Sequence, residues 1–222
     1  MPYRVTLRPL CLCVALLALV RGGQPSLVSA QARGTDPPGA DRAGATYRGG
    51  LVTPPLPKPR FTLTDTSGAP FDFWQQTQGH VTLLFFGYAR CPDQCPLHLS
   101  NIALGLKKLP MAVGGQIKLV FVTTDPGRDT PQLIRAWLNQ FDKRFVGLTG
   151  TQAAIESAER AAGVPVAART MLAGENYSVS HANFVVAYTK DNLAHVIYPG
   201  GVTQQDWLHD LPQLVQEAWS SR

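Results

Sequence analysis

Residues 85–96 have the sequence FFGYARCPDQCP, which places Cys91 and Cys95 between an apolar run and an amphipathic one. The run 81–86 is typical of a strand that is covered on both faces, and the apolar spacing after the cysteines predicts a helix that ends before Pro110. The thiols are therefore expected where a buried strand meets a helix. Three residues separate them, one more than in a C-x-x-C redox motif, which favours a shared metal ion over rapid disulfide exchange.

Pro96 gives a second indication of the geometry of the pair. Because proline has no N–H to donate inside a helix, we expect the helix to begin near Pro96, with Cys95 close to its N-terminus. Both sulfurs would then lie at the positive end of the helix dipole, which favours the thiolate that binds metals and attacks disulfides. The alternative is a structural disulfide between Cys91 and Cys95, but it would close only a very short loop and add little stability.

The first 30 residues have the pattern of a secretory signal peptide. Two arginines precede the uncharged stretch 9–20, and the small residues at 28–30 resemble a cleavage site. This stretch is shorter than the roughly 20 residues that a membrane-spanning helix needs. We therefore expect an extracytoplasmic protein, in the periplasm or cell-envelope space, whereas an uncleaved signal would leave it anchored to the membrane. Cleavage would remove Cys11 and Cys13 and leave one thiol pair.

The charge of the chain excludes an electrostatic case for nucleic acid as a partner. The full chain carries a net charge of +5, but three of its 20 Lys and Arg residues lie in the predicted signal, which contains no Asp or Glu. Cleavage would leave 17 basic residues against 15 acidic ones, a net charge of +2. A charge this small, without clustering, gives no basic surface for a polyanion.

Residues 31–59 are predicted to be a linker, because they are rich in Gly and Ala and end in the stiff, extended sequence PPLPKP at 54–59. Residues 60–222 remain. A segment of about 160 residues is a single domain of ordinary size with room for a full core.

The sequence of this domain alternates predicted strands with predicted helices. The predicted strands are 61–63 and 70–73, which form an N-terminal hairpin, followed by 81–86, 117–123, 145–148, 183–188 and 194–198. The predicted helices follow Pro96, begin at Thr130-Pro131, span 151–162 before Gly163, and span 206–219. The sequence predicts an α/β fold with a central mixed sheet, helices on both faces and an N-terminal hairpin extension. With a cysteine pair after the first core strand, this is a thioredoxin-like layout.

Three motifs in order resemble the Sco/SenC family of copper-binding, thioredoxin-fold proteins. They are CPDQCP at 91–96, TDPGRDTP at 124–131 and YSVSH at 177–181, and the resemblance extends over about residues 46–215. It implies a role as a metallochaperone that assists assembly of the binuclear copper centre, CuA, of cytochrome c oxidase. The implied partners are the copper-accepting oxidase subunit and an upstream copper donor or thiol reductant.

The resemblance also implies that Cys91, Cys95 and His181 hold copper, as Cu(I) or Cu(II). Two thiolates and one imidazole form a soft set of few ligands that suits Cu(I). A closed zinc site would need four protein ligands, and only three candidates can be named. The chain departs from the family at Ser180, where an acid usually precedes the histidine.

Other residues compete for the metal. His98 has a suitable spacing from Cys95, but one turn along the helix its side chain is expected to face solvent. Met111 and Met171 could supply a thioether, although Met is more often core filler. His80, His195 and His209 are interpreted as structural.

The motif at 124–131 has two interpretations of equal weight. Asp125, Arg128 and Asp129 could form a partner surface or support the cysteine loop. Alternatively, they form a capped turn in which Arg128 pairs with Asp125 and either Asp129 or Thr130 caps the next helix. Asp93, between the cysteines, could tune the metal or accept hydrogen bonds from loop N–H groups.

Three classes of function remain. The first is a copper metallochaperone. The second is a thiol–disulfide oxidoreductase that uses Cys91 and Cys95 to keep the copper-ligand cysteines of a partner reduced. The third, a thiol peroxidase, is disfavoured because such enzymes need a Thr or Ser near an isolated peroxidatic cysteine, whereas these cysteines are paired and flanked by proline.

Overall fold

The computed structural model describes residues 47–172, 177–217 and 219. The predicted signal peptide, 1–30, and the predicted linker up to residue 46 lie outside these residues. The strands are β1 (Gly50–Pro57), β2 (Thr62–Asp65), β3 (Pro70–Asp72), β4 (Val81–Gly87), β5 (Ile117–Thr123), β6 (Val146–Thr149), β7 (Ala168–Met171), β8 (Tyr177–Ser180), β9 (Phe184–Tyr188) and β10 (Leu193–Pro199). The helices are α1 (Phe73–Gln76), α2 (Gln94–Lys108), α3 (Met111–Gly114), α4 (Pro131–Leu138), α5 (Gln152–Ala161) and α6 (Gln204–Gln216). Within the described ranges, no helix is long and apolar enough to cross a membrane.

Eight strands form one mixed sheet in the order β1-β10-β9-β4-β5-β6-β2-β3. The central strands β4, β5 and β6 are parallel, and every other neighbouring pair is antiparallel. The register places Gly87 beside Thr123, so β4 and β5 end together and the loops that follow them are neighbours. The predicted mixed sheet and its hairpin extension, β2 and β3, are confirmed.

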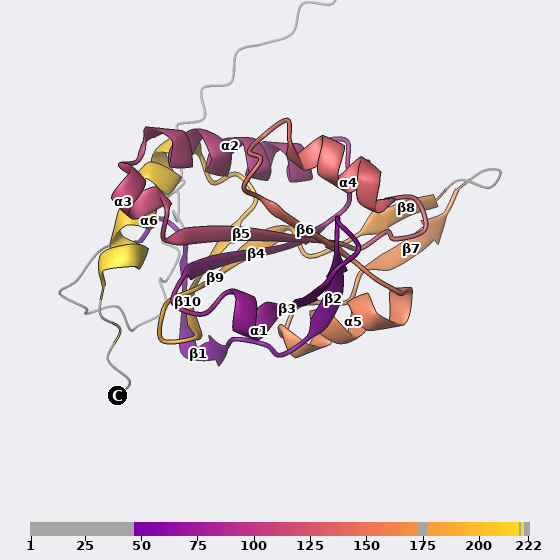
Figure 1. The fold of residues 1–222 in the computed structure, drawn as a ribbon, viewed down its shortest axis with the longest axis horizontal. Helices are drawn as coiled ribbons and strands as arrows, with labels where there is room; N and C mark the ends of the chain where they lie inside the picture. The colour runs from indigo at the N-terminus through magenta and orange to yellow at the C-terminus, as the bar shows by residue number, and fades with distance from the viewer. Residues whose placement is uncertain (1–46, 173–176, 218, 220–222) are drawn as a thin grey trace, which may run out of the picture. The chain divides into compact units, whose positions relative to one another are not determined.

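Both faces of the sheet are covered by helices. Side chains alternate along a strand, so successive residues of β4 and β5 enter different cores. Leu83, Phe85 and Phe121 pack with α2, α4 and α6, whereas Leu84 and Val122 pack with α1 and α5. Figure 1 shows α2 and α4 along one face and α1 and α5 along the other. Every residue of β4 is buried, as predicted for a strand covered on both sides.

Part of the predicted linker is wrong, because residues 50–57 form strand β1 at the edge of the sheet. β1 pairs antiparallel with β10, and its register shifts between Leu51 and Leu56. Before the strand, the backbone N–H groups of Arg48 and Gly49 donate to the buried Asp210 of α6. A proline-rich segment can occupy this position because an edge strand has one side on which no N–H is needed. The folded domain therefore begins before residue 60.

The strands β7 and β8 form a separate two-stranded sheet that the patterns do not predict. All four residues of β7 are exposed, so the strand lacks the apolar signal on which the prediction depends. β8 ends at Ser180, and His181 follows directly. Figure 1 shows the β7–β8 pair beside the end of the main sheet. This small sheet carries the predicted histidine ligand.

Candidate metal centre

The cysteine loop leaves the sheet at Gly87 and returns as α2. The Cys91 N–H donates to the carbonyl of Tyr88, which closes a turn, and α2 begins at Gln94 with Asp93 as its N-cap. Pro96 is then the third residue of the helix, where its missing N–H has no intrahelical partner to lose. The predicted start near Pro96 is thus correct to within one turn. The Asp93 carboxylate makes no capping hydrogen bond and instead accepts from the Gln94 side chain at 2.8 Å.

Gly87 allows the Cys95 sulfur to approach the end of β4. A Cβ atom at position 87 would lie 2.8 Å from Cys95 Sγ and 3.1 Å from the Phe121 ring, closer than real Cβ contacts normally allow. Cys95 itself lies in the first turn of α2 and is fully buried in the core. The glycine therefore determines how deep Cys95 sits. No pattern in the sequence assigns a role to Gly87. Its role follows from the packing of β4 against α2, where a side chain at this position would displace Cys95.

His181 lies against both cysteines. Its Nε2 is 3.4 Å from Cys95 Sγ, and one ligand atom from each of Cys91, Cys95 and His181 lies within 4.8 Å of the others. The backbone N–H of Cys95 also lies 3.4 Å from Cys91 Sγ. Among the described residues, no other cluster of three or more His, Cys, Asp or Glu has this closeness. The three predicted ligands are brought together across 86 residues of chain.

The orientation of the His181 ring suits a ligand. Its Nδ1 lies 3.1 Å from the carbonyl of Ala182, and a hydrogen bond there would place the proton on Nδ1 and leave the lone pair of Nε2 toward the sulfurs. The ring meets Tyr88 and Phe85 edge to face, with centroid distances of 5.6 Å and 6.1 Å. These contacts hold the imidazole before any metal arrives.

The two thiols differ in protonation. A hydrogen bond from Cys95 is the main cause that lowers the pKa of Cys91 well below its usual value; burial opposes this fall, and nearby backbone N–H groups add to it. The same hydrogen bond, together with burial, raises the pKa of Cys95. The proton shared by the pair is therefore favoured on Cys95, which is buried, and the negative charge on Cys91, which is partly exposed; both cysteines are free. A metal that binds both sulfurs must release the proton of Cys95.

The turn after β5 combines both interpretations made from sequence. Arg128 pairs with Asp125, and the Thr130 hydroxyl accepts from the N–H of Leu133 to cap α4, as in a capped turn. Asp129, however, does not cap the helix: it accepts from the N–H of Ala89 at 2.8 Å. That contact ties the turn to the cysteine loop.

Two expectations about competing residues are wrong. His98 does not face solvent: it is 2 % exposed, packs against Phe85 in a tilted arrangement with a centroid distance of 5.1 Å, and lies outside the group of three. His98 lies on the same face of α2 as Cys95, Leu99 and Ile102, and that face packs into the core. Met111 and Met171 are not core filler, because both are well exposed.

The remaining histidines have local partners, in agreement with a structural role. His195 Nε2 lies 2.7 Å from a carboxylate oxygen of Asp191, and His209 Nδ1 lies 2.6 Å from one of Asp210. His80 Nδ1 lies 2.8 Å from a backbone carbonyl two residues earlier.

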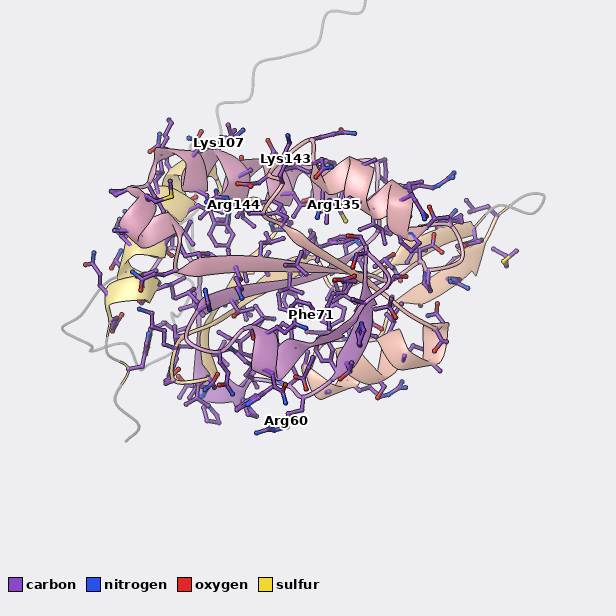
Figure 2. The ribbon with its side chains drawn as sticks, in the orientation of Figure 1. Arg60, Phe71, Lys107, Arg135, Lys143 and Arg144 are labelled. Atoms are coloured by element: carbon purple, nitrogen blue, oxygen red, sulfur yellow. The ribbon has the colours of Figure 1, made fainter. Side chains whose placement is uncertain are left out.

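A surface cavity lies away from these ligands, beside the start of β6. Its lining includes Phe71, Arg135, Lys143 and Arg144, which Figure 2 labels, and none of the three candidate ligands. Arg135 donates to the carbonyl of Phe145, and Arg144 pairs with Asp142. The candidate metal centre is thus defined by its ligands and not by a pocket.

Comparison with known proteins identifies the family of this chain. The sequence model of the SCO1/SenC family matches residues 53–216. The chain belongs to the SCO1/SenC family. It is 37% identical over 124 residues to a Stutzerimonas stutzeri protein named as a proposed copper-binding protein, and 32% identical over 125 residues to the mitochondrial protein SCO2 of Saccharomyces cerevisiae. These matches cover 56% of this chain, but only 60% and 41% of those relatives.

Solved structures of SCO1/SenC proteins have the same thioredoxin-like fold. Apo Sco1 from Thermus thermophilus is 29% identical, with a TM-score of 0.70, and the match covers 78% of this chain and all of that one. ScoI from Bradyrhizobium japonicum, solved with copper bound, is 28% identical with a TM-score of 0.64 over 72% of this chain and 99% of that one.

Proposed function

We propose that this protein is an exported copper metallochaperone that assists assembly of the CuA centre of cytochrome c oxidase. The observation that carries the proposal is the convergence of Cys91, Cys95 and His181, with ligand atoms within 4.8 Å of one another, in a chain of the SCO1/SenC family. Copper-bound structures exist for ScoI of Bradyrhizobium japonicum and for yeast Sco1, which are 28% and 27% identical to this chain.

The donor set fits copper. Two sulfur atoms and an imidazole nitrogen form a soft ligand set of low coordination number, which suits Cu(I). Because Cys91 and His181 are partly exposed, a bound ion would be accessible to a partner protein. When bound, copper is the cargo of the protein. The copper-accepting oxidase subunit would receive it, and an upstream donor would supply it. The signal-like pattern of residues 1–30 supports an extracytoplasmic location.

The ligand assignment is tested by titrating the reduced protein with Cu(I) against a chromophoric Cu(I) chelator. We expect one copper per chain, and loss of tight binding in Cys91→Ala, Cys95→Ala and His181→Ala. His80→Ala is the matched control, because this partly exposed histidine lies outside the group. Full affinity in His181→Ala would contradict the assignment. Delivery is tested by mixing copper-loaded protein with the reduced, metal-free CuA domain and following the CuA absorption.

A second function, thiol–disulfide reduction, is favoured by the asymmetry of the pair. The Cys91 thiolate is partly exposed and would attack a disulfide of the partner, which releases one partner thiolate and forms a mixed disulfide. Cys95 would then lose its proton and attack Cys91, which releases the second partner thiolate. The products are a Cys91–Cys95 disulfide and a reduced partner, and an external dithiol must reduce the pair for a further cycle.

This second function predicts turnover without metal. Metal-free protein should reduce a disulfide formed by the copper-ligand cysteines of the oxidase subunit, with excess dithiothreitol as the reductant. In a single turnover of pre-reduced protein without dithiothreitol, Cys95→Ala should stop at the mixed disulfide. A rate equal to that of dithiothreitol alone would exclude the reductase and leave the metallochaperone proposal intact.

A further inference from the structure

The main sheet holds His181 from one side only. The cysteine loop follows β4, and His181 lies between β8, which pairs only with β7 in a separate sheet, and β9, which pairs with β4 in the main sheet. The register of β9 on β4 therefore brings the chain near the end of β4, but it does not hold the segment that leads into His181. Other contacts must hold the β7–β8 pair against the domain.

The main contacts converge on the buried carboxylate of Asp125, in the turn after β5. The Tyr177 hydroxyl, at the start of β8, donates to Asp125 Oδ1 at 2.6 Å. Arg169 of β7 reaches the same oxygen at 3.4 Å. Arg128 pairs with the other oxygen, donates to the backbone carbonyl of Tyr177 at 3.0 Å and lies over the Tyr177 ring, 3.8 Å from its centroid. One carboxylate thus engages both strands of the small sheet.

Asp129, four residues later, holds the other side of the centre. Its Oδ2 accepts from the N–H of Ala89 at 2.8 Å and from the Thr123 hydroxyl at 2.7 Å. Ala89 lies two residues before Cys91. The two residues are joined by a backbone hydrogen bond from the Asp129 N–H to the Asp125 carbonyl at 2.9 Å. Both aspartates are fully buried.

We propose that the turn 124–130 sets the spacing of the metal centre, with Asp125 as the positioning residue for His181 and Asp129 as the positioning residue for the cysteine loop. This inference rests on the proposed copper function. A turn that grips both ligand-bearing segments keeps their separation constant, whereas two independent attachments would let it vary. Bound metals are sensitive to such support, because loss of an outer partner typically weakens affinity about 10- to 100-fold.

Other contacts also restrain the small sheet, so the effect of Asp125 should be partial. Val179 of β8 is buried, and Glu159 of α5 accepts from the N–H of Ala167, just before β7. Asn183, two residues after His181, lies 3.4 Å from the Gln94 side chain at the start of α2. Removing the Asp125 contacts should loosen the histidine without unfolding the domain.

The test is a double-mutant cycle on Cu(I) affinity, measured by chelator competition on the full chain. Asp125→Asn and Tyr177→Phe should each weaken binding about 10- to 100-fold when His181 is present. In a His181→Ala background they should cause no further loss, because they act through that histidine. Asp129→Asn should weaken binding in both backgrounds, because it acts through the cysteine loop. Asp142→Asn, which breaks the ion pair with Arg144 outside the centre, is the matched control and should leave affinity unchanged.

Two further readouts separate positioning from general stability. Urea unfolding of the metal-free variants reports any loss of stability, and Tyr177→Phe removes only one hydroxyl, so it remains informative if Asp125→Asn folds poorly. The Cu(II) electron paramagnetic resonance spectrum should lose nitrogen hyperfine structure in Asp125→Asn and Tyr177→Phe. Wild-type affinity in both variants, or an equal loss with and without His181, would overturn the inference. If the wild-type protein itself binds no copper, the proposed function fails instead.

Discussion

At the scale of single residues, the metal centre depends on a glycine as well as on its three predicted ligands. Gly87 has no Cβ, and that space is occupied by the sulfur of Cys95 and the ring of Phe121. The sequence could predict the cysteines from their motif. It could not predict that the residue before the loop must be glycine, because this requirement arises from packing between β4 and α2.

We predict that Gly87→Ala weakens copper binding and destabilises the metal-free protein. The added methyl would lie 2.8 Å from Cys95 Sγ, so the sulfur must move, and overpacking of this kind typically costs about 1–3 kcal/mol. Urea unfolding and Cu(I) competition measure the two effects. Gly114→Ala is the matched control, because its new Cβ would meet only a carbonyl at 3.7 Å. Unchanged affinity in Gly87→Ala would show that Cys95 does not need its present depth.

His98 gives a prediction for the pH dependence of stability. Burial is the main cause that lowers its pKa in the folded state, and the neighbouring His181 adds to this, while Asn183 and Cys91 oppose it. The histidine pKa in the unfolded chain is about 6.5, so as the pH falls below this value the unfolded chain binds a proton more readily than the folded chain does. Stability from this residue is present above the unfolded pKa and falls as the pH drops below it.

The variant His98→Leu should remove this dependence. Between pH 7.5 and 5, the free energy of unfolding of the variant relative to the wild type should rise as the pH falls, by at most about 1.4 kcal/mol per pH unit. Urea unfolding of the metal-free proteins at several pH values measures the difference. A difference that stays constant over this range would mean that His98 is protonated equally in both states.

At the scale of elements, the sequence did not predict β1 or the small sheet of β7 and β8, because these strands lack a continuous apolar pattern. The residues of β1 are mostly exposed and include several prolines, those of β7 are all exposed, and β8 buries only Val179. Periodicity finds strands through the face they bury, so it finds β4 and β5 and misses these three. They are held by backbone pairing and by individual buried carboxylates, Asp210 for the approach to β1 and Asp125 for the small sheet.

We predict that a chain beginning at residue 60 is less stable than one beginning at residue 47. The shorter chain loses the β1–β10 pairing and leaves Asp210 without the N–H groups of Arg48 and Gly49. Each net hydrogen bond contributes about 1 kcal/mol, so a loss of at least about 2 kcal/mol is expected. Urea unfolding of both chains measures it. Equal stability of the two chains would support a domain boundary at residue 60, as predicted from the sequence, and would show that β1 is dispensable.

At the scale of the whole molecule, the sequence predicted the fold class and the central strands, because long apolar runs determine them. It indicated the chemistry of the cysteine pair from local spacing, but His181 entered only through the family resemblance, since 86 residues separate it from Cys95. The folded chain brings these segments together through the ends of β4 and β5 and the turn that follows. Metal binding should therefore be linked to the stability of the entire domain and not only to its loop.

We predict that Cu(I) stabilises the reduced protein and not the oxidised one. A ligand that binds only the folded state adds about 4 kcal/mol when its free concentration is 1,000 times its dissociation constant. Oxidation ties up both sulfurs in a disulfide, and metal binding needs free thiolates, so this gain should vanish in oxidised protein and in Cys91→Ser. Thermal unfolding with and without Cu(I), buffered by a chelator, measures the shift. An equal shift in oxidised protein would place the copper on ligands other than this thiol pair.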